Sequence, residues 1–307
     1  MPEVRASMAL TAALACLAMP APAQNLSPYD VNALPSKPAD ARVPYGTDPL
    51  QFGDLRVPQG PGPFAVVVVI HGGCWLSIAN LDNTAPMADA LRDAGVATWN
   101  VEYRPVDRHG GGWPGTFEDI GAALDSVRAL AAKHPLDPNR VVVAGHSAGA
   151  HLALWAAARS RLKSDSPLHG DNPLPVLAAV ALGGPGDLRD FETYGHEICG
   201  PAVEQLLGGA PDAVPERWAQ ASPAELLPLG TRQVLIVGET DRVMPERARE
   251  AYVAKARAAG DTIEVVVVPG AHFEVIAPTT KAFVTVKDQI LGLLGIGAAP
   301  AAAAGRH

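Results

Sequence analysis

A serine in a glycine-flanked turn is the residue of this chain best suited to nucleophilic chemistry. Residues 145–149 read G-H-S-A-G with Ser147 at the centre, and they follow the apolar run 140–144 directly. A helix-like stretch rich in Ala, Leu and Trp comes next. This strand-turn-helix layout is typical of a nucleophile elbow, in which small neighbours allow a sharp turn that exposes the serine hydroxyl.

Two loops farther along the chain carry an imidazole and a carboxylate that would complete this chemistry. His272 follows the last expected strand, and Asp241 follows the strand before it. The carboxyl ends of parallel strands meet at one edge of a sheet, where ligands bind. A neutral imidazole can accept the serine proton, and a carboxylate on a neighbouring loop fixes its tautomer. We predict Ser147 as nucleophile, His272 as base and Asp241 as the orienting acid.

Other residues compete for two of these roles. Glu239 and Asp187 are alternative acids, and Asp241 has an alternative role as a helix N-cap. The other histidines fit the role of base less well, because they flank the serine or lie in irregular stretches: His109, His134, His146, His151, His169 and His196.

A second turn has the composition of an anion-binding loop. Residues 71–75 read H-G-G-C-W and follow the first strongly apolar strand. Small residues let backbone N–H groups point toward an oxyanion, together with the N–H that follows the serine. The predicted donors are the amides of Gly72, Gly73, Cys74 and Ala148. We expect His71 to tie the turn by hydrogen bonds rather than to transfer protons.

The substrate pocket is expected beside these loops. Trp75 has two possible roles. Packing beneath the turn is the favoured interpretation, and forming a platform for substrate is the alternative. The candidate pocket residues are Trp75, Trp113, His146 and Phe273. Further wall residues are expected from 104–114 and from the irregular segment after Gly183.

The alternation of short β-branched runs with longer helix-like segments predicts an α/β fold. Runs such as 66–70 and 265–268 lack polar alternation, so their strands are expected to be buried on both faces of a largely parallel sheet. The expected strands are 64–70, 96–101, 141–144, 176–182, 233–237 and 264–268. The expected helices are 84–93, 116–133, 148–159, 245–259 and 279–294. We predict about eight strands, helices on both faces and a small lid-like insertion within 183–228, with a second irregular stretch at 162–175.

Composition limits the kinds of partner. The 307 residues carry a formal net charge of −8 and show no block of Lys and Arg, which argues against nucleic acid or an anionic membrane as partner. No C-x-x-C pair, H-E-x-x-H motif or carboxylate-rich loop indicates a metal. We therefore predict a small-molecule substrate, no cofactor, no metal and no stable membrane insertion. The oligomeric state stays open.

The first 23 residues read as a secretory signal peptide. They contain Arg5, an apolar stretch over 8–19 and the small-residue site Ala21-Pro22-Ala23, and the apolar core is too short for a permanent span. A disordered tail and a lipid anchor at Cys16 are weaker alternatives. We expect a periplasmic or secreted protein, a linker or strap over 24–50, a catalytic domain over 51–296 and a disordered Ala-rich tail over 297–307.

Two cysteines, Cys74 and Cys199, would remain after cleavage. A disulfide can form in an oxidising compartment, but the sequence does not fix the distance between the two Cα atoms. Two unpaired buried thiols are an expectation of at least equal weight.

The motifs resemble one known family. The order Ser147, Asp241, His272 is that of the α/β-hydrolases, and residues 64–295 are similar to that family. The H-G-G-x-W turn, the G-H-S-A-G elbow and the stretch 100–104 resemble the esterase and arylformamidase-like branch related to hormone-sensitive lipases. The resemblance implies hydrolysis of carboxylic esters or aryl formamides by the residues named above. Cys74 stands where relatives often have a third glycine, which leaves open which amides bind the oxyanion.

The expected function is hydrolysis of carboxylic esters of small or aryl substrates through an acyl-enzyme on Ser147. One alternative is an arylformamidase that cleaves substrates such as N-formylkynurenine. Another is a binding protein without catalysis on the same fold. Proline-type exopeptidase activity is disfavoured, because we find no glutamate-rich site for a substrate amine.

Overall fold

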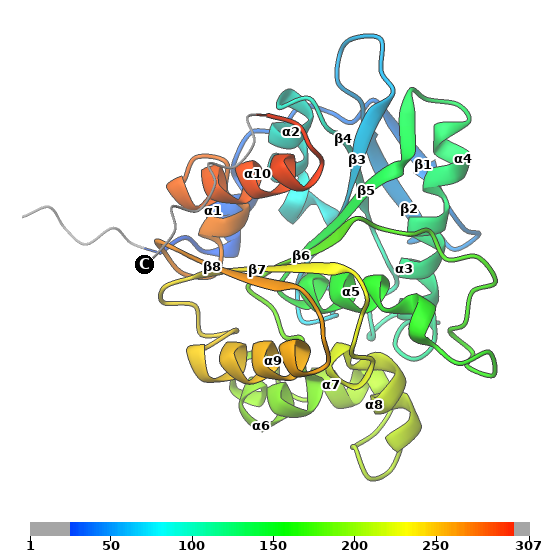
Figure 1. Cartoon of the computed structure of the whole chain (residues 1–307), viewed down its shortest axis with the longest axis vertical. Helices are drawn as coiled ribbons and strands as arrows, with labels where there is room; N and C mark the ends of the chain where they lie inside the picture. The colour runs from blue at the N-terminus through cyan, green and yellow to red at the C-terminus, as the bar shows by residue number, and fades with distance from the viewer. Residues whose placement is uncertain (1–24, 298–307) are drawn as a thin grey trace, which may run out of the picture.

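An eight-stranded sheet forms the centre of the molecule (Figure 1). The computed structural model describes residues 25–297, so the predicted signal peptide and residues 298–307 of the predicted tail lie outside the described residues. The strand order is β1-β2-β4-β3-β5-β6-β7-β8. Strand β2 (Phe52–Arg56) runs antiparallel to both of its neighbours, the edge strand β1 (Ala41–Pro44) and strand β4 (Ala97–Val101).

The other neighbouring pairs of the sheet are parallel. The strands involved, besides β4, are β3 (Phe64–Ile70), β5 (Leu136–His146), β6 (Ala178–Leu182), β7 (Arg232–Gly238) and β8 (Ile263–Val268). The valines of β3 are buried on both faces, as the absence of polar alternation predicts. The same prediction is wrong for 265–268, because β8 is an edge strand and Val267 is 48% exposed. The prediction of a mostly parallel sheet of about eight strands is confirmed.

Helices cover both faces of this sheet and bury two apolar clusters. On one face lie α2 (Ala85–Asp93), α10 (Lys281–Leu293) and the short α1 (Pro28–Asn32), which pack on alternate residues such as Val67 and Val69. On the other face lie α3 (Gly115–Asp125), α4 (Val127–Ala131), α5 (Ala148–Ala157) and α9 (Glu246–Ala258), around Val66 and Val68.

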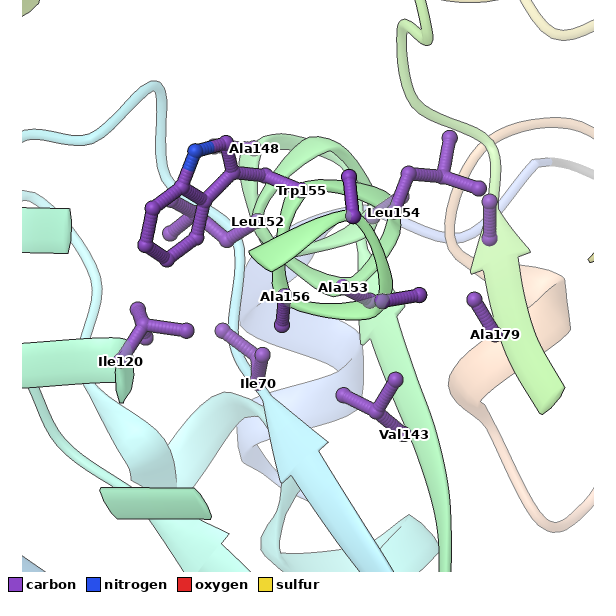
Figure 2. Packing of buried hydrophobic residues seen from close by; sticks show 14 of the residues in the cluster. Ile70, Ile120, Val143, Ala148, Leu152, Ala153, Leu154, Trp155, Ala156 and Ala179 are labelled. Atoms are coloured by element: carbon purple, nitrogen blue, oxygen red, sulfur yellow. The ribbon is translucent and has the colours of Figure 1, made fainter. Parts of the chain in front are cut away.

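Helix α5 is buried over its entire length, which fixes the residue that precedes it. Its sequence A-G-A-H-L-A-L-W-A-A has no polar face except one histidine, and such helices belong in a core. Figure 2 shows α5 above Ile70 and Val143 of the sheet, with Trp155 directed toward Ile120 of α3. Ser147 is therefore carried at the N-terminus of a rigid element.

Three segments differ from the expectations. The expected helix over 116–133 is divided at Ser126, whose hydroxyl donates a hydrogen bond to the Ala123 carbonyl at 2.7 Å. The expected linker over 24–50 contributes α1 and the edge strand β1. The expected lid-like insertion contains α6 (Leu188–Cys199), α7 (Ala202–Leu207) and α8 (Pro215–Ala221).

The 3-10 turns are η1 (Leu81–Thr84), η2 (Arg159–Arg161), η3 (Pro223–Glu225) and η4 (Glu274–Ile276).

None of the helices that the structure describes is long and apolar enough to cross a membrane.

Candidate active site

Ser147 sits in a strained turn between β5 and α5. Its backbone has φ 56° and ψ −120°, outside the regions that non-glycine residues favour. The turn closes because the residue two positions before the serine has no side chain: a Cβ on Gly145 would lie 2.0 Å from the Gly149 carbonyl oxygen. The Ser147 N–H donates to the Leu182 carbonyl of β6 at 2.8 Å. Strain held in place by the surrounding structure is characteristic of a nucleophile elbow.

His272 and Asp241 form a hydrogen-bonded pair. Nδ1 of His272 lies 3.0 Å from Oδ2 of Asp241, whose side chain is fully buried. We assign the proton to Nδ1, because an ionised carboxylate only accepts. The second oxygen, Oδ1, accepts the Val243 N–H at 2.7 Å. Nε2 of His272 is then left as the acceptor that a general base needs.

Gly183 makes room for this pair and was missed by the sequence interpretation. It follows β6 with φ +58°, and a Cβ there would lie 2.5 Å from Asp241 Oδ2 and 3.1 Å from His272 Nδ1. The available signal was the dipeptide Gly183-Gly184 directly after a buried strand. A Cβ on Gly184 would lie 2.0 Å from the Ser147 carbonyl oxygen, so this second glycine is equally constrained.

The two alternative acids lie elsewhere. Asp187 caps α6 by accepting the N–H groups of Arg189 and Asp190, and it also accepts from Lys255 of α9. Glu239 is exposed and makes no hydrogen bond to His272. Asp241 is thus the carboxylate that the structure brings to His272.

The H-G-G-C-W turn lies directly against the serine. A Cβ on Gly72 would lie 2.9 Å from Ser147 Cβ, so only glycine allows this approach. The next three residues, Gly73, Cys74 and Trp75, all have positive φ, at 104°, 54° and 58°. Within residues 25–297, none of the four predicted donors, the amides of Gly72, Gly73, Cys74 and Ala148, pairs with an acceptor. These N–H groups are therefore free to bind an oxyanion.

His71 fastens this turn to the end of β4. Its Nδ1 lies 2.8 Å from the Gly72 carbonyl oxygen, and its Nε2 lies 2.8 Å from Oε1 of the buried Glu102. The ring of Tyr103 stacks on the imidazole at 4.4 Å. Each ring nitrogen of His71 is thus engaged in holding the turn.

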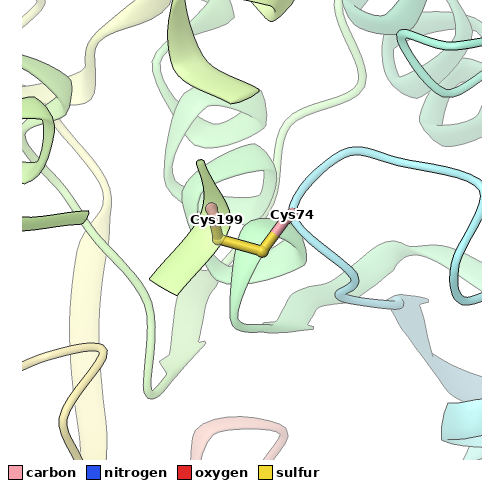
Figure 3. The surroundings of a disulfide bond; sticks show 2 residues. All are labelled: Cys74 and Cys199. Carbon is pink, nitrogen blue, oxygen red and sulfur yellow. A yellow bond between two sulfur atoms is a disulfide. The ribbon is translucent and has the colours of Figure 1, made fainter. Parts of the chain in front are cut away.

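Cys74 and Cys199 form a disulfide, so the expectation of two unpaired thiols is wrong. Figure 3 shows the bond between the turn and the end of α6. The two Cα atoms lie 5.5 Å apart although 125 positions separate them in the sequence. Such a distance suits a disulfide, but only the complete fold produces it.

Ser147, His146 and His272 line one cavity of about 510 Å³, together with Gly73, Cys74 and Phe273. Two candidate pocket residues, Trp75 and Trp113, do not line it. Trp75 is 1% exposed, and its indole N–H donates to Nδ1 of His151 at 3.2 Å, so it packs beneath the turn. The ring of Trp113 instead lies edge-on to the ring of Phe117, with 5.7 Å between the two ring centroids.

The N-terminal segment forms one wall of this cavity, which the sequence interpretation missed. Tyr29 and Asn32 of α1 line it. Asn32 accepts a hydrogen bond from Asn83 at 2.8 Å, and the Leu26 N–H donates to Oε1 of Glu274 at 2.7 Å. The other oxygen of Glu274 accepts the N–H of Ala271, the residue before His272, at 2.9 Å. Glu274 thereby links this wall to the histidine loop.

His146 holds the loop that carries His272 by a hydrogen bond. Its Nε2–H donates to the His272 carbonyl at 2.9 Å, and the two rings lie 4.4 Å apart. Burial lowers the pKa of His146 well below its usual value, and the neighbouring His272 lowers it further. A neutral His146 places no positive charge beside an imidazole that must accept a proton.

His151 of α5 is a second buried neutral histidine. It accepts from Trp75 at Nδ1 and donates to the Ala221 carbonyl at 2.9 Å, which joins the turn to α8. Burial lowers its pKa to about 4, although the hydrogen bond to Ala221 opposes the shift.

The His151 shift predicts a loss of stability in acid. The unfolded chain binds a proton on this residue below about pH 6.5, whereas the native protein does not until about pH 4. The stabilisation is complete above the first value and falls by roughly 3 kcal/mol toward the second. Urea unfolding at pH 7.5 and pH 4.5 measures this loss. His151→Gln, which cannot titrate, should show a smaller difference between the two pH values, and an equal difference would contradict the assignment.

Among the described residues, no group of three or more His, Cys, Asp or Glu side chains is placed to hold a metal ion.

The chain matches one protein family and several curated esterases. The BD-FAE family matches residues 54–255. Esterase LipC of Mycobacterium tuberculosis is 27% identical over 226 residues, which are 71% of this chain and 55% of LipC. The chain thus spans about half the length of this relative.

Two solved structures share the fold. A truncated carbohydrate esterase from gut microbiota superposes with a TM-score of 0.70 at 22% identity, covering 84% of this chain and 99% of that one. Esterase B of Lactobacillus rhamnosis superposes with a TM-score of 0.72 at 18% identity, covering 87% and 89%. Family match and fold agree: the chain belongs to the BD-FAE family and is an α/β-hydrolase of the branch related to hormone-sensitive lipases.

Proposed function

We propose that this protein is a serine hydrolase that cleaves carboxylic esters of small or aryl substrates through an acyl-enzyme on Ser147. The observation that carries the proposal is the convergence of three parts on one cavity. These parts are a strained serine, a histidine paired with a buried carboxylate, and a turn with free amide N–H groups. The esterase LipC as a sequence relative supports the same reaction class.

The proposed mechanism follows from these positions. His272 removes the Ser147 proton while Oγ attacks the ester carbonyl carbon, and the free amides of the H-G-G-C-W turn and of Ala148 bind the resulting oxyanion. His272 then gives the proton to the leaving alcohol, and the ester bond breaks. Water attacks the acyl-enzyme with the same assistance, releases the carboxylic acid and restores the serine. Each oxyanion donor contributes about 3 to 4 kcal/mol in the transition state.

Aryl-formamide hydrolysis is the second candidate, because the H-G-G-x-W turn resembles that of arylformamidases. Parallel assays with p-nitrophenyl acetate and N-formylkynurenine distinguish the two reactions. We expect the higher kcat/KM on the ester. A higher kcat/KM on the formamide would reverse the assignment, and no turnover of either substrate would favour a binding protein.

We also propose that the protein acts in the periplasm or outside the cell. The signal-peptide pattern of residues 1–23 and the Cys74–Cys199 disulfide support this proposal, because disulfides persist in oxidising compartments. N-terminal sequencing of the exported protein tests it, with Gln24 expected as the first residue. An uncleaved, cytoplasmic protein would contradict it.

A further inference from the structure

We propose that Arg242 binds an anionic group of the substrate, so that the protein prefers esters carrying a carboxylate over neutral esters of the same size. This inference rests on the proposed function of Ser147, because it concerns the specificity of that site.

Arg242 occupies a fixed place in the loop that carries the orienting acid. It follows Asp241 directly, is exposed and lines the cavity shared by Ser147 and His272. The loop is held on both sides of it. Thr240 N–H donates to the Gly270 carbonyl at 3.0 Å, and Val243 N–H donates to Asp241 Oδ1 at 2.7 Å. These hydrogen bonds therefore fix the position of the Arg242 backbone relative to the loop that carries His272.

The charge of Arg242 stands alone in this cavity. Among the described residues that line it, Arg242 is the only Arg or Lys, and no Asp or Glu lines it. Within residues 25–297, Arg242 makes no ion pair and no hydrogen bond. By contrast Arg247, five positions later, pairs with Asp190 at 2.9 Å. An incoming anion would thus meet a guanidinium that has no competing partner.

A guanidinium binds carboxylates through two parallel N–H donors, which gives direction as well as attraction. The electrostatic field of the whole protein opposes this attraction, because the chain carries a net charge of −8, which repels anions. A preference for anionic esters therefore needs a cation inside the cavity that holds Ser147, and Arg242 lines that cavity.

The remainder of the cavity mouth suits the uncharged part of such a substrate. Tyr29, Ile78 and Ile198 line the cavity and are 81%, 75% and 37% exposed. Apolar side chains left exposed around a pocket are typical of a ligand-binding surface. The expected substrate class is an ester with an apolar or aryl portion and one carboxylate.

The test compares two esters that differ by one charge. The substrates are p-nitrophenyl hemisuccinate, which is anionic, and p-nitrophenyl valerate, which is neutral and of similar length. The measured quantity is the ratio of their kcat/KM values in the wild type, Arg242→Gln, Arg242→Lys and the control Arg247→Gln. We expect the ratio to fall about tenfold in Arg242→Gln, mainly through KM for the anionic ester, and to fall less in Arg242→Lys. Arg247→Gln should keep the wild-type ratio. An unchanged ratio in Arg242→Gln would overturn the proposal.

A binding measurement separates this inference from the proposed reaction. Calorimetry with monomethyl succinate on Ser147→Ala, with and without Arg242→Gln, needs no catalysis. Affinity weaker by about tenfold in the double variant supports anion binding even if neither ester is hydrolysed. Equal affinity in both proteins overturns it, whatever the activity assays show.

Discussion

Ser147→Ala is expected to lower kcat on p-nitrophenyl acetate by a factor of about 10⁴ or more. The loss follows because no other hydroxyl stands in the strained turn with φ 56° beside the His272–Asp241 pair. Any residual rate above that in water would come from the free amides of the oxyanion turn and from binding alone. Steady-state kinetics on the purified variant measures the effect.

Ser164→Ala is the matched control, since Ser164 is exposed and does not line the cavity of Ser147 and His272. It should retain wild-type kcat. Unfolding curves should show that Ser147→Ala is folded, so that a lost activity reports chemistry. A Ser147→Ala protein with more than a tenth of wild-type kcat would contradict the proposed nucleophile.

Removal of the disulfide is expected to be the largest perturbation of stability. The double variant Cys74→Ser, Cys199→Ser lacks a bond that closes a loop over a sequence separation of 125. Because the unfolded chain then gains conformational entropy, the free energy of unfolding should fall by about 2 to 5 kcal/mol. The kcat should fall as well, because Cys74 belongs to the turn whose amides are proposed to bind the oxyanion. Chemical denaturation and ester kinetics measure both effects.

Reduction of the wild type provides the control for this prediction. Treatment with dithiothreitol should bring the wild-type stability and kcat close to those of the double variant, and it should not alter the double variant further. A double variant with the stability and kcat of the wild type would show that the bond is dispensable for both.

The parts of the site that the sequence predicted are those encoded locally. Ser147 and Asp241 each lie just beyond a buried strand, and His272 lies beyond the partly exposed edge strand β8. Parallel strands deliver such residues to one edge of the sheet. The strands themselves were readable because runs such as Val66–Ile70 lack polar alternation, which is typical of burial on both faces.

The missed features depend on contacts between distant segments. The Cys74–Cys199 bond joins a turn to the end of α6, and the sequence does not state the distance between them. Gly183 matters only because Asp241 and His272 fold onto it.

The remaining misses have local causes. The indole of Trp75 lies in the core, which confirms the favoured interpretation, so its place among the candidate pocket residues was wrong. Three successive residues with positive φ shape the turn there, which the letters H-G-G-C-W do not show. The helices of 183–228 were hidden by frequent Pro and Gly, which here separate short helices rather than prevent them. The N-terminal wall escaped for a similar reason, because α1 has five residues in a Pro-rich stretch.

Covalent labelling with a fluorophosphonate tests the central claim most directly. The reagent reacts with a serine that is activated by a neighbouring base, and peptide mass spectrometry locates the adduct. We expect one adduct, on Ser147, that forms as ester hydrolysis is lost and is absent from Ser147→Ala. Full ester hydrolysis in a protein whose Ser147 remains unlabelled would contradict the proposed acyl-enzyme.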